Sequence, residues 1–124
     1  MRRDGGNAVN VVIIILSLLL AVAFIATGWP KAVANRTAQG QAEHLRVPMG
    51  GYRALGVVEI AAALGLILGL WWRPVGLLAS GGLVVLMVGA TIAHRRVGDA
   101  PSAAVPALVL GLVALLDFIL IVTR

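Results

Sequence analysis

The chain has 124 residues, of which 60% are hydrophobic and only 12% are charged, and its net charge is +5. A soluble domain of this length could not bury so much apolar surface, because small domains keep much of their surface in water and carry about 25% charged residues. The lack of cysteine excludes disulfides and thiolate metal sites within the chain. Most basic residues stand at the ends of apolar segments, which favours contact with anionic lipid headgroups over nucleic acid.

The first apolar segment covers about residues 8–28 and is rich in Val, Ile and Leu. It is long enough to cross about 30 Å of hydrocarbon as a helix. Trp29 and Pro30 predict its end, because an indole suits the interface and a proline removes a helical donor. Arg2 and Arg3 precede it, so a secretory signal is the alternative. Its apolar stretch is longer than the about 7–15 residues of a signal core, which favours a retained helix.

Segment 30–50 is polar and long for a connection within a helical bundle. Its alanines allow a short helix at the membrane interface, bounded by Pro30 and Pro48. His44 lies in this segment, and we expect its side chain to be solvated. The segment therefore predicts a polar interfacial element and not a fifth span.

Three further segments are long and apolar enough to span a membrane, at about residues 51–72, 75–94 and 102–122. The first two are separated by a very short turn, so they are expected to be antiparallel neighbours. Together with the first segment they predict an all-α fold, an integral membrane up-and-down four-helix bundle that forms one domain over residues 1–124. A lipid bilayer is the expected environment.

Small residues predict where these helices touch. Ala61, Gly65 and Gly69 form a ladder that lets two backbones approach closely. At 100° per residue this ladder lies about 200–280° around the helix from Glu59, so tight packing and the carboxylate occupy different faces. Two further pairs give the same packing signal: Gly82 with Gly89, and Ala107 with Gly111.

Glu59 is the most informative residue, because no other acidic or basic side chain lies between Ala54 and Trp72. A charge at the centre of a bilayer costs about 2.5–3.5 kcal/mol on insertion scales, so such a carboxylate normally faces a bundle interior or a wet cavity. We therefore expect Glu59 to handle a ligand or protons. The alternative is a carboxyl group that only hydrogen-bonds helices together.

Up-and-down threading brings Lys31, Arg53 and His94 to the membrane face nearest Glu59. Arg53 is about 120° around the helix from Glu59, so Lys31 or His94, from neighbouring helices, are easier partners. His94 has a second interpretation, as an interfacial residue at a helix C-terminus, where a cation is mildly favoured. Asp117, near the far end of the last helix, is expected to reach the headgroups as a structural residue. The pocket lining expected around Glu59 is Tyr52, Gly56, Ala63 and Thr91.

Four motifs follow one another over nearly the whole chain: Phe24-x3-Gly28-x2-Lys31, Arg53-x2-Gly56-x2-Glu59, Gly65-Leu66-x2-Gly69 and Met87-x-Gly89-Ala90-x3-His94. Their combination resembles the DoxX-like family of small four-helix bacterial membrane proteins. The resemblance implies a bundle in the bacterial cytoplasmic (inner) membrane, with Lys31, Arg53, Glu59 and His94 as its polar cluster. Related proteins are described as small subunits of quinone-linked oxidoreductases or as partners in redox-defence complexes. A shared fold does not specify a reaction.

The leading interpretation is an accessory or redox-complex subunit that binds a lipophilic molecule such as a quinone, or relays protons, at Glu59. Electrons would come from a membrane or peripheral oxidoreductase partner, because the sequence shows no haem motif. Two scattered histidines and one deep carboxylate do not predict a metal site. Enzymatic activity is left open, with a non-catalytic subunit favoured.

Two alternatives remain on the sequence. One is a small proton-coupled transporter acting as a dimer, although transporters of that size place their glutamate in the first helix and not the second. The other is a purely structural membrane scaffold. A homo-oligomer is compatible with each of these interpretations.

Overall fold

The structure is a computed structural model that describes residues 3–124, with side chains from residue 7 onward. The elements are α1 (Arg3–Ala32), α2 (Arg36–His44), α3 (Met49–Leu68), α4 (Arg73–Arg96), the 3-10 turn η1 (Pro101–Ala104) and α5 (Val105–Thr123). In the described chain, α1, α3 and α4, and α5 together with η1, are long and apolar enough to cross a membrane. The predicted all-α four-helix membrane bundle is confirmed. Arg2 and the side chain of Arg3 are outside the part of the chain that the structure describes.

The first helix continues past its predicted end, because Pro30 lies inside its last turns and not beyond them. The chain then turns at Ala34, whose φ is +53°. The N–H of Ala34 donates to the carbonyl of Lys31, and the N–H of Asn35 donates to that of Pro30. This pair of bonds is a Schellman-type helix ending. It keeps Lys31 helical, one turn after Thr27 on the same face of α1.

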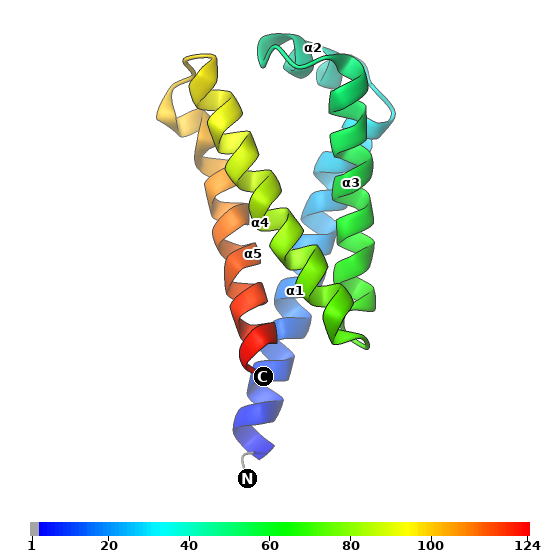
Figure 1. The fold of residues 1–124 in the computed structure, drawn as a ribbon, viewed down its shortest axis with the longest axis vertical. Coiled ribbons are helices and arrows are strands. Elements are labelled where there is room, and N and C mark those ends of the chain that lie inside the picture. The colour runs from blue at the N-terminus through cyan, green and yellow to red at the C-terminus, as the bar shows by residue number, and fades with distance from the viewer. Residues whose placement is uncertain (1–2) are drawn as a thin grey trace.

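The polar segment contains the predicted short helix as α2. The Asn35 side chain accepts a hydrogen bond from the N–H of Ala38 at 2.8 Å, which satisfies one free donor at the start of the helix. Ala38 and Ala42 are buried, and they pack with Leu45 and Tyr52 in a small cluster. The apolar face of α2 therefore rests on the start of α3 (Figure 1).

The four long helices associate mainly as two pairs, α1 with α3 and α4 with α5. Glycines allow the closest approaches. A Cβ on Gly56 would lie 2.6 Å from the carbonyl oxygen of Gly28, and one on Gly69 would overlap the Cα of Gly76. The second contact holds α3 and α4 together beside their hairpin turn. Away from that turn the two helices diverge toward α2, leaving a wedge between the pairs (Figure 1).

The span boundaries differ from the predicted ones by a few residues. The span predicted at 51–72 is Met49–Leu68, because the tryptophans Trp71 and Trp72 belong to the turn and not to the helix. The span predicted at 75–94 begins at Arg73, with proline in its first turn, and ends at Arg96. The span predicted at 102–122 begins as the 3-10 turn before α5.

Some packing signals were right and others wrong. Gly65 and Gly69 pack against Ala79 and Gly76 of α4, and Gly111 packs against Met87, as the spacing predicts. The prediction for Gly82 and Gly89 is wrong, because a Cβ at either position would meet no atom within 4 Å. Ala61 lies exposed beside a shallow outer groove. The closest contact of α3 with α1 uses Gly28 and Gly56, which lie outside the ladder.

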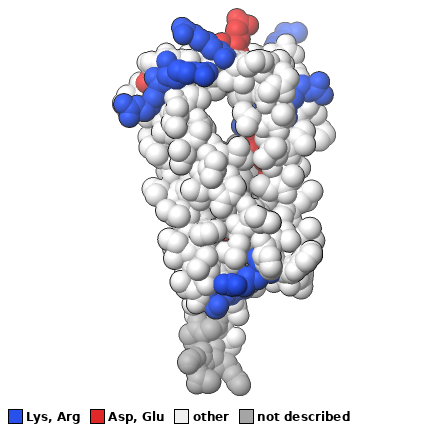
Figure 2. Space-filling view, in the orientation of Figure 1, with Lys and Arg blue, Asp and Glu red and all other residues white. Residues whose placement is uncertain are grey.

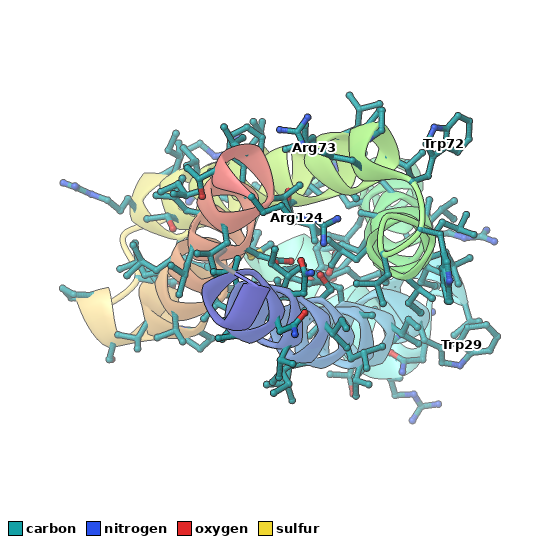
Figure 3. The ribbon with its side chains drawn as sticks, turned by 90° about the horizontal axis from the view of Figure 1, so that it is seen from below. Trp29, Trp72, Arg73 and Arg124 are labelled. Atoms are coloured by element: carbon teal, nitrogen blue, oxygen red, sulfur yellow. The ribbon has the colours of Figure 1, made fainter. Side chains whose placement is uncertain are left out.

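The surface fits a membrane-spanning bundle. On the visible face, basic side chains gather at both ends of the molecule and acidic ones at the α2 end (Figure 2). Between the ends the outer surface is uncharged, and charged atoms show only where they are recessed in the hollow (Figure 2). Trp29, Trp71 and Trp72 are 61%, 81% and 65% exposed. Seen along the bundle, Trp29 and Trp72 point away from its centre (Figure 3). Outward tryptophans at helix ends are typical of the membrane interface.

Candidate functional site

Glu59 faces the bundle interior and is 3% exposed. Both of its carboxylate oxygens are bonded by α1. Thr27 Oγ1 donates to Oε1 at 2.8 Å, and Lys31 Nζ donates to Oε2 at 2.6 Å. Thr27 and Lys31 are four residues apart and so share one helical face. The close approach at Gly56 brings that face near enough to hold the carboxylate between them.

Lys31 is one of the two partners that threading allowed for Glu59, and the Lys31 side chain is 21% exposed. Its ammonium also lies 5.4 Å from the centroid of the Tyr52 ring, within range of a cation–π interaction. Arg53 points away from this pair. Its Nε donates to the carbonyl of Ala32 at 3.2 Å, and the side chain is exposed. Arg53 therefore closes the end of α1 and takes no part in binding Glu59.

A pocket of about 320 Å³ lies in the wedge beside this ion pair. Its polar wall consists of Lys31, Gln41, Tyr52, Glu59 and His94. Its apolar wall comes mainly from the second half of α4, at Val85, Leu86, Met87, Gly89, Ala90 and Ala93. Gln41 and Leu45 bring the α2 segment over the same space. The molecule is visibly hollowed below its α2 end (Figure 2).

His94 lines this pocket but does not bond Glu59, which corrects the expected pairing. Its Nδ1 lies 2.6 Å from Asp99 Oδ2, and His44 Nε2 lies 2.7 Å from Asp99 Oδ1. The chain turns back at Gly98, whose φ is +77°, and the N–H of Asp99 donates to the carbonyl of His94. One carboxylate thus joins α2 to the end of α4. The expectation that His44 is only solvated is wrong.

The bonds to Asp99 make the attachment of α2 sensitive to acid. The pKa of Asp99 is lowered from its ordinary value of 3.8, chiefly by the hydrogen bond to His94 and further by His44, against the effect of partial burial. A lowered folded-state pKa means that the carboxylate stabilises the fold above the ordinary pKa, and that this contribution is lost as the pH falls below 3.8. The bond from Arg96 to the carbonyl of Leu45 does not titrate in that range and remains.

We expect Asp99→Asn, or acid pH, to loosen α2 from the end of α4. The chain lacks cysteine, so Gly40→Cys on the exposed side of α2 carries a single spin label, and a Cβ there meets no atom within 4 Å. The label should move several-fold faster in Asp99→Asn than in the parent at neutral pH, and the parent should approach that mobility in acid. Equal mobility in both proteins at neutral pH would show that Asp99 does not hold α2.

The other predicted lining residues are dispersed. Tyr52 lines the pocket as expected. Ala63 is wholly buried in the main core, and Gly56 faces α1. Thr91 lies beside a different and smaller apolar pocket between α4 and α5, with its hydroxyl donating to the carbonyl of Met87. These three expectations for the pocket are wrong.

Asp117 is fully buried and does not reach the headgroups, which corrects the sequence-based expectation. Ser17 Oγ donates to its Oδ2 at 2.7 Å.

Three residues of the site were missed by the sequence analysis: Thr27, Gln41 and Asp99. Thr27 could have been found from the sequence, because it stands four residues before Lys31 and so shares its helical face. Gly98 after a basic helix end was a signal for a turn that places Asp99 near His94.

The arrangement combines a paired acid and base with an apolar cavity. Glu59 and Lys31 neutralise one another, so the pocket favours a neutral or weakly polar guest. The polar wall is rich in donors, because Lys31, Tyr52 and Gln41 carry N–H or O–H groups. Such a wall suits oxygen acceptors on an otherwise apolar molecule.

One of the comparisons with known proteins assigns the chain to a family. Residues 15–116, nearly the whole chain, match the DoxX-like family. The sequence matches no functionally curated protein and no solved structure. The four spans and this match make the protein a multi-pass membrane protein. The chain belongs to the DoxX-like family.

Proposed function

We propose that the protein binds a lipophilic molecule with oxygen acceptors at its polar end, of the quinone class, in the pocket beside Glu59. The observation that carries this proposal is the pocket itself. Its volume of about 320 Å³ lies within the usual range for small-molecule sites, and donors converge on one wall while α4 supplies hydrocarbon on the other. The wedge between α3 and α4 gives such a molecule a route from the bilayer.

The proposal also covers the membrane in which the protein works and the partner with which it works. We infer that the protein works in a bacterial cytoplasmic membrane as an accessory subunit of an oxidoreductase, which supplies or removes electrons. In this role Lys31 and Tyr52 donate to the carbonyl oxygens of the guest. The ion pair with Glu59 orients the Lys31 side chain, and the Thr27 bond fixes the carboxylate. His94 lines the pocket and contacts Asp99, so its ring can pass protons between a reduced guest and this carboxylate.

A matched pair of variants tests the binding site. Gly89 lines the pocket and Gly82 lines the outer groove, seven residues away on the same helix. A Cβ at either glycine meets no atom within 4 Å, so both leucine variants should fold. Native mass spectrometry of gently purified protein should find a lipophile bound to the parent and to Gly82→Leu. Gly89→Leu should lose it by at least tenfold.

Two outcomes would reject the proposed binding site, and a third would reject only the accessory role. One is a parent protein that carries no lipophile when purified with native lipids and resupplied with a quinone. Another is equal occupancy in the two leucine variants, which places the molecule elsewhere. Parent protein that never purifies with a redox subunit under mild conditions would reject the accessory role while leaving the binding site intact.

A further inference from the structure

The half of the bundle opposite the pocket contains a second buried acid, Asp117 on α5. Its exposed fraction is 0%, and its Oδ2 lies 2.7 Å from the hydroxyl of Ser17 on α1. Its Oδ1 has no hydrogen-bond partner among the described residues. A buried polar atom without a partner is costly, and an ionised carboxylate is the most costly case. Packing alone does not explain why a carboxyl group is buried at this position.

Asp117 and Ser17 form one rung of a polar seam between α1 and α5. The second rung joins Arg124 Nη1 to Asn10 Oδ1 at 3.2 Å. Asn10 precedes Ser17 by seven residues on α1. Asp117 precedes Arg124 by the same number on α5, so both rungs lie on one face of each helix. The second rung is exposed at the end of the bundle, where Arg124 reaches over the middle of the molecule (Figure 3). An arginine at the end of a span lies at the level of the lipid headgroups, where water is present. The second rung is about 10 Å from the buried one along the helix.

We propose that Asp117 is a proton-binding site that holds a neutral carboxylic acid and exchanges its proton with water at the end of the bundle that bears the chain termini. The bond in which Ser17 Oγ donates to Oδ2 reverses in the neutral acid, where the O–H on Oδ2 donates to Ser17 Oγ. The 2.7 Å separation is the usual length of an O–H···O bond in either direction. Oδ1 is then a carbonyl oxygen, for which a missing partner costs much less than for a carboxylate. Release gives the carboxylate and a proton to water, and uptake reverses this step.

The charges around Asp117 favour this state over a permanent ion pair. Of the described side chains at this end, the charged ones are Arg73 on α4 and Arg124 on α5. Arg73 donates to the carbonyls of Ile121 and Val122 at 3.2 and 2.9 Å. Arg124 donates to Asn10. Among the described residues neither forms an ion pair with Asp117, and Arg124 is close enough to act electrostatically on its carboxylate when the proton leaves.

A proton fits this site better than a metal cation does. One carboxyl group and one hydroxyl group meet here, and the described residues provide no group of three acidic or histidine ligands. Hard cations need about six oxygen ligands. The site is also separate from the pocket. Ser17 is 14 residues before Lys31, about 21 Å along α1, and the wholly buried Phe24 lies between them. The proposal therefore stands independently of ligand binding at Glu59.

Infrared spectroscopy of the full chain in lipid vesicles tests the proposal. Near neutral pH the parent should show an absorption band of a protonated carboxyl group that Asp117→Asn removes. Ser17→Ala should keep the band and move it to higher frequency, because the hydrogen bond from the acid is lost. Glu43→Gln, at an exposed acid on α2, should leave the band unchanged. In D2O the parent band should shift as the proton exchanges.

Two results would overturn the proposal. No band sensitive to Asp117→Asn or Ser17→Ala would mean that Asp117 is ionised. A band that keeps its position after long incubation in D2O would mean a sealed structural acid without access to water. Ser17→Ala carries the test by itself if Asp117→Asn does not fold.

Discussion

Glu59→Gln is expected to lower the free energy of unfolding by about 3 kcal/mol, because it leaves the Lys31 ammonium without its counter-charge in a mostly buried position. Removing one partner of a buried ion pair costs about 3–5 kcal/mol, and the partial exposure of Lys31 moves the expected value to the low end. Lys31→Met should cost a similar amount, since it leaves the carboxylate with Thr27 alone. Thermal and denaturant unfolding in detergent micelles measures both.

The double variant Lys31→Met with Glu59→Gln is the decisive member of this series. With both charges gone, it should lose much less stability than the sum of the two single variants, by about 1–3 kcal/mol. Arg53→Gln is the matched control, because Arg53 is exposed and bonds only a carbonyl of α1, and it should change stability by no more than about 0.5 kcal/mol. Additive single effects would mean that Lys31 and Glu59 are not coupled.

The same variants separate the structural role of the pair from its role in binding. A stable double variant that keeps the bound lipophile would reduce the pair to a link between α1 and α3. A stable double variant that loses the lipophile would support the pocket proposal, because the fold is preserved and only the polar wall has changed.

Gly56→Ala is expected to destabilise the bundle by about 3 kcal/mol, the upper part of the range for overpacked cores. The new Cβ would lie 2.6 Å from the N atom of Ala32, the carbonyl oxygen of Gly28 and the Cβ of Lys31. Two of these atoms are backbone, so no side-chain rotation relieves the contact, and α1 has to move away from α3. Unfolding in micelles should show the lower stability. The coupling energy between Lys31 and Glu59 should also fall, because α1 has moved away from α3.

Gly50→Ala is the control for this substitution. It lies in the first turn of the same helix, and a Cβ there meets no atom within 4 Å. Alanine is a better helix former than glycine, so this variant should be unchanged or more stable by up to about 1 kcal/mol. Equal stability of Gly56→Ala and Gly50→Ala would contradict the close packing of α1 on α3.

The sequence by itself determined the class of the protein, its four spans and its most informative residue. Apolar length decides whether a segment crosses a membrane, and this property is local. The cost of a charge in hydrocarbon is also independent of fold, so Glu59 had to face inward, as it does. Threading alone left Lys31 and His94 as candidate partners, because the ends of their helices share a membrane face with the start of α3. The structure decides for Lys31.

Only the tertiary structure decided which distant side chains meet. The rotation of each helix about its axis and its crossing angle are set by packing, and no local pattern contains them. The Gly69–Gly76 contact closes α3 on α4 at one end, and this closure creates the wedge that holds the pocket. The same rotation buries Asp117 against Ser17, 100 residues away in sequence. Thr91, one turn from His94, is turned toward α5 and lies outside the pocket for the same physical reason.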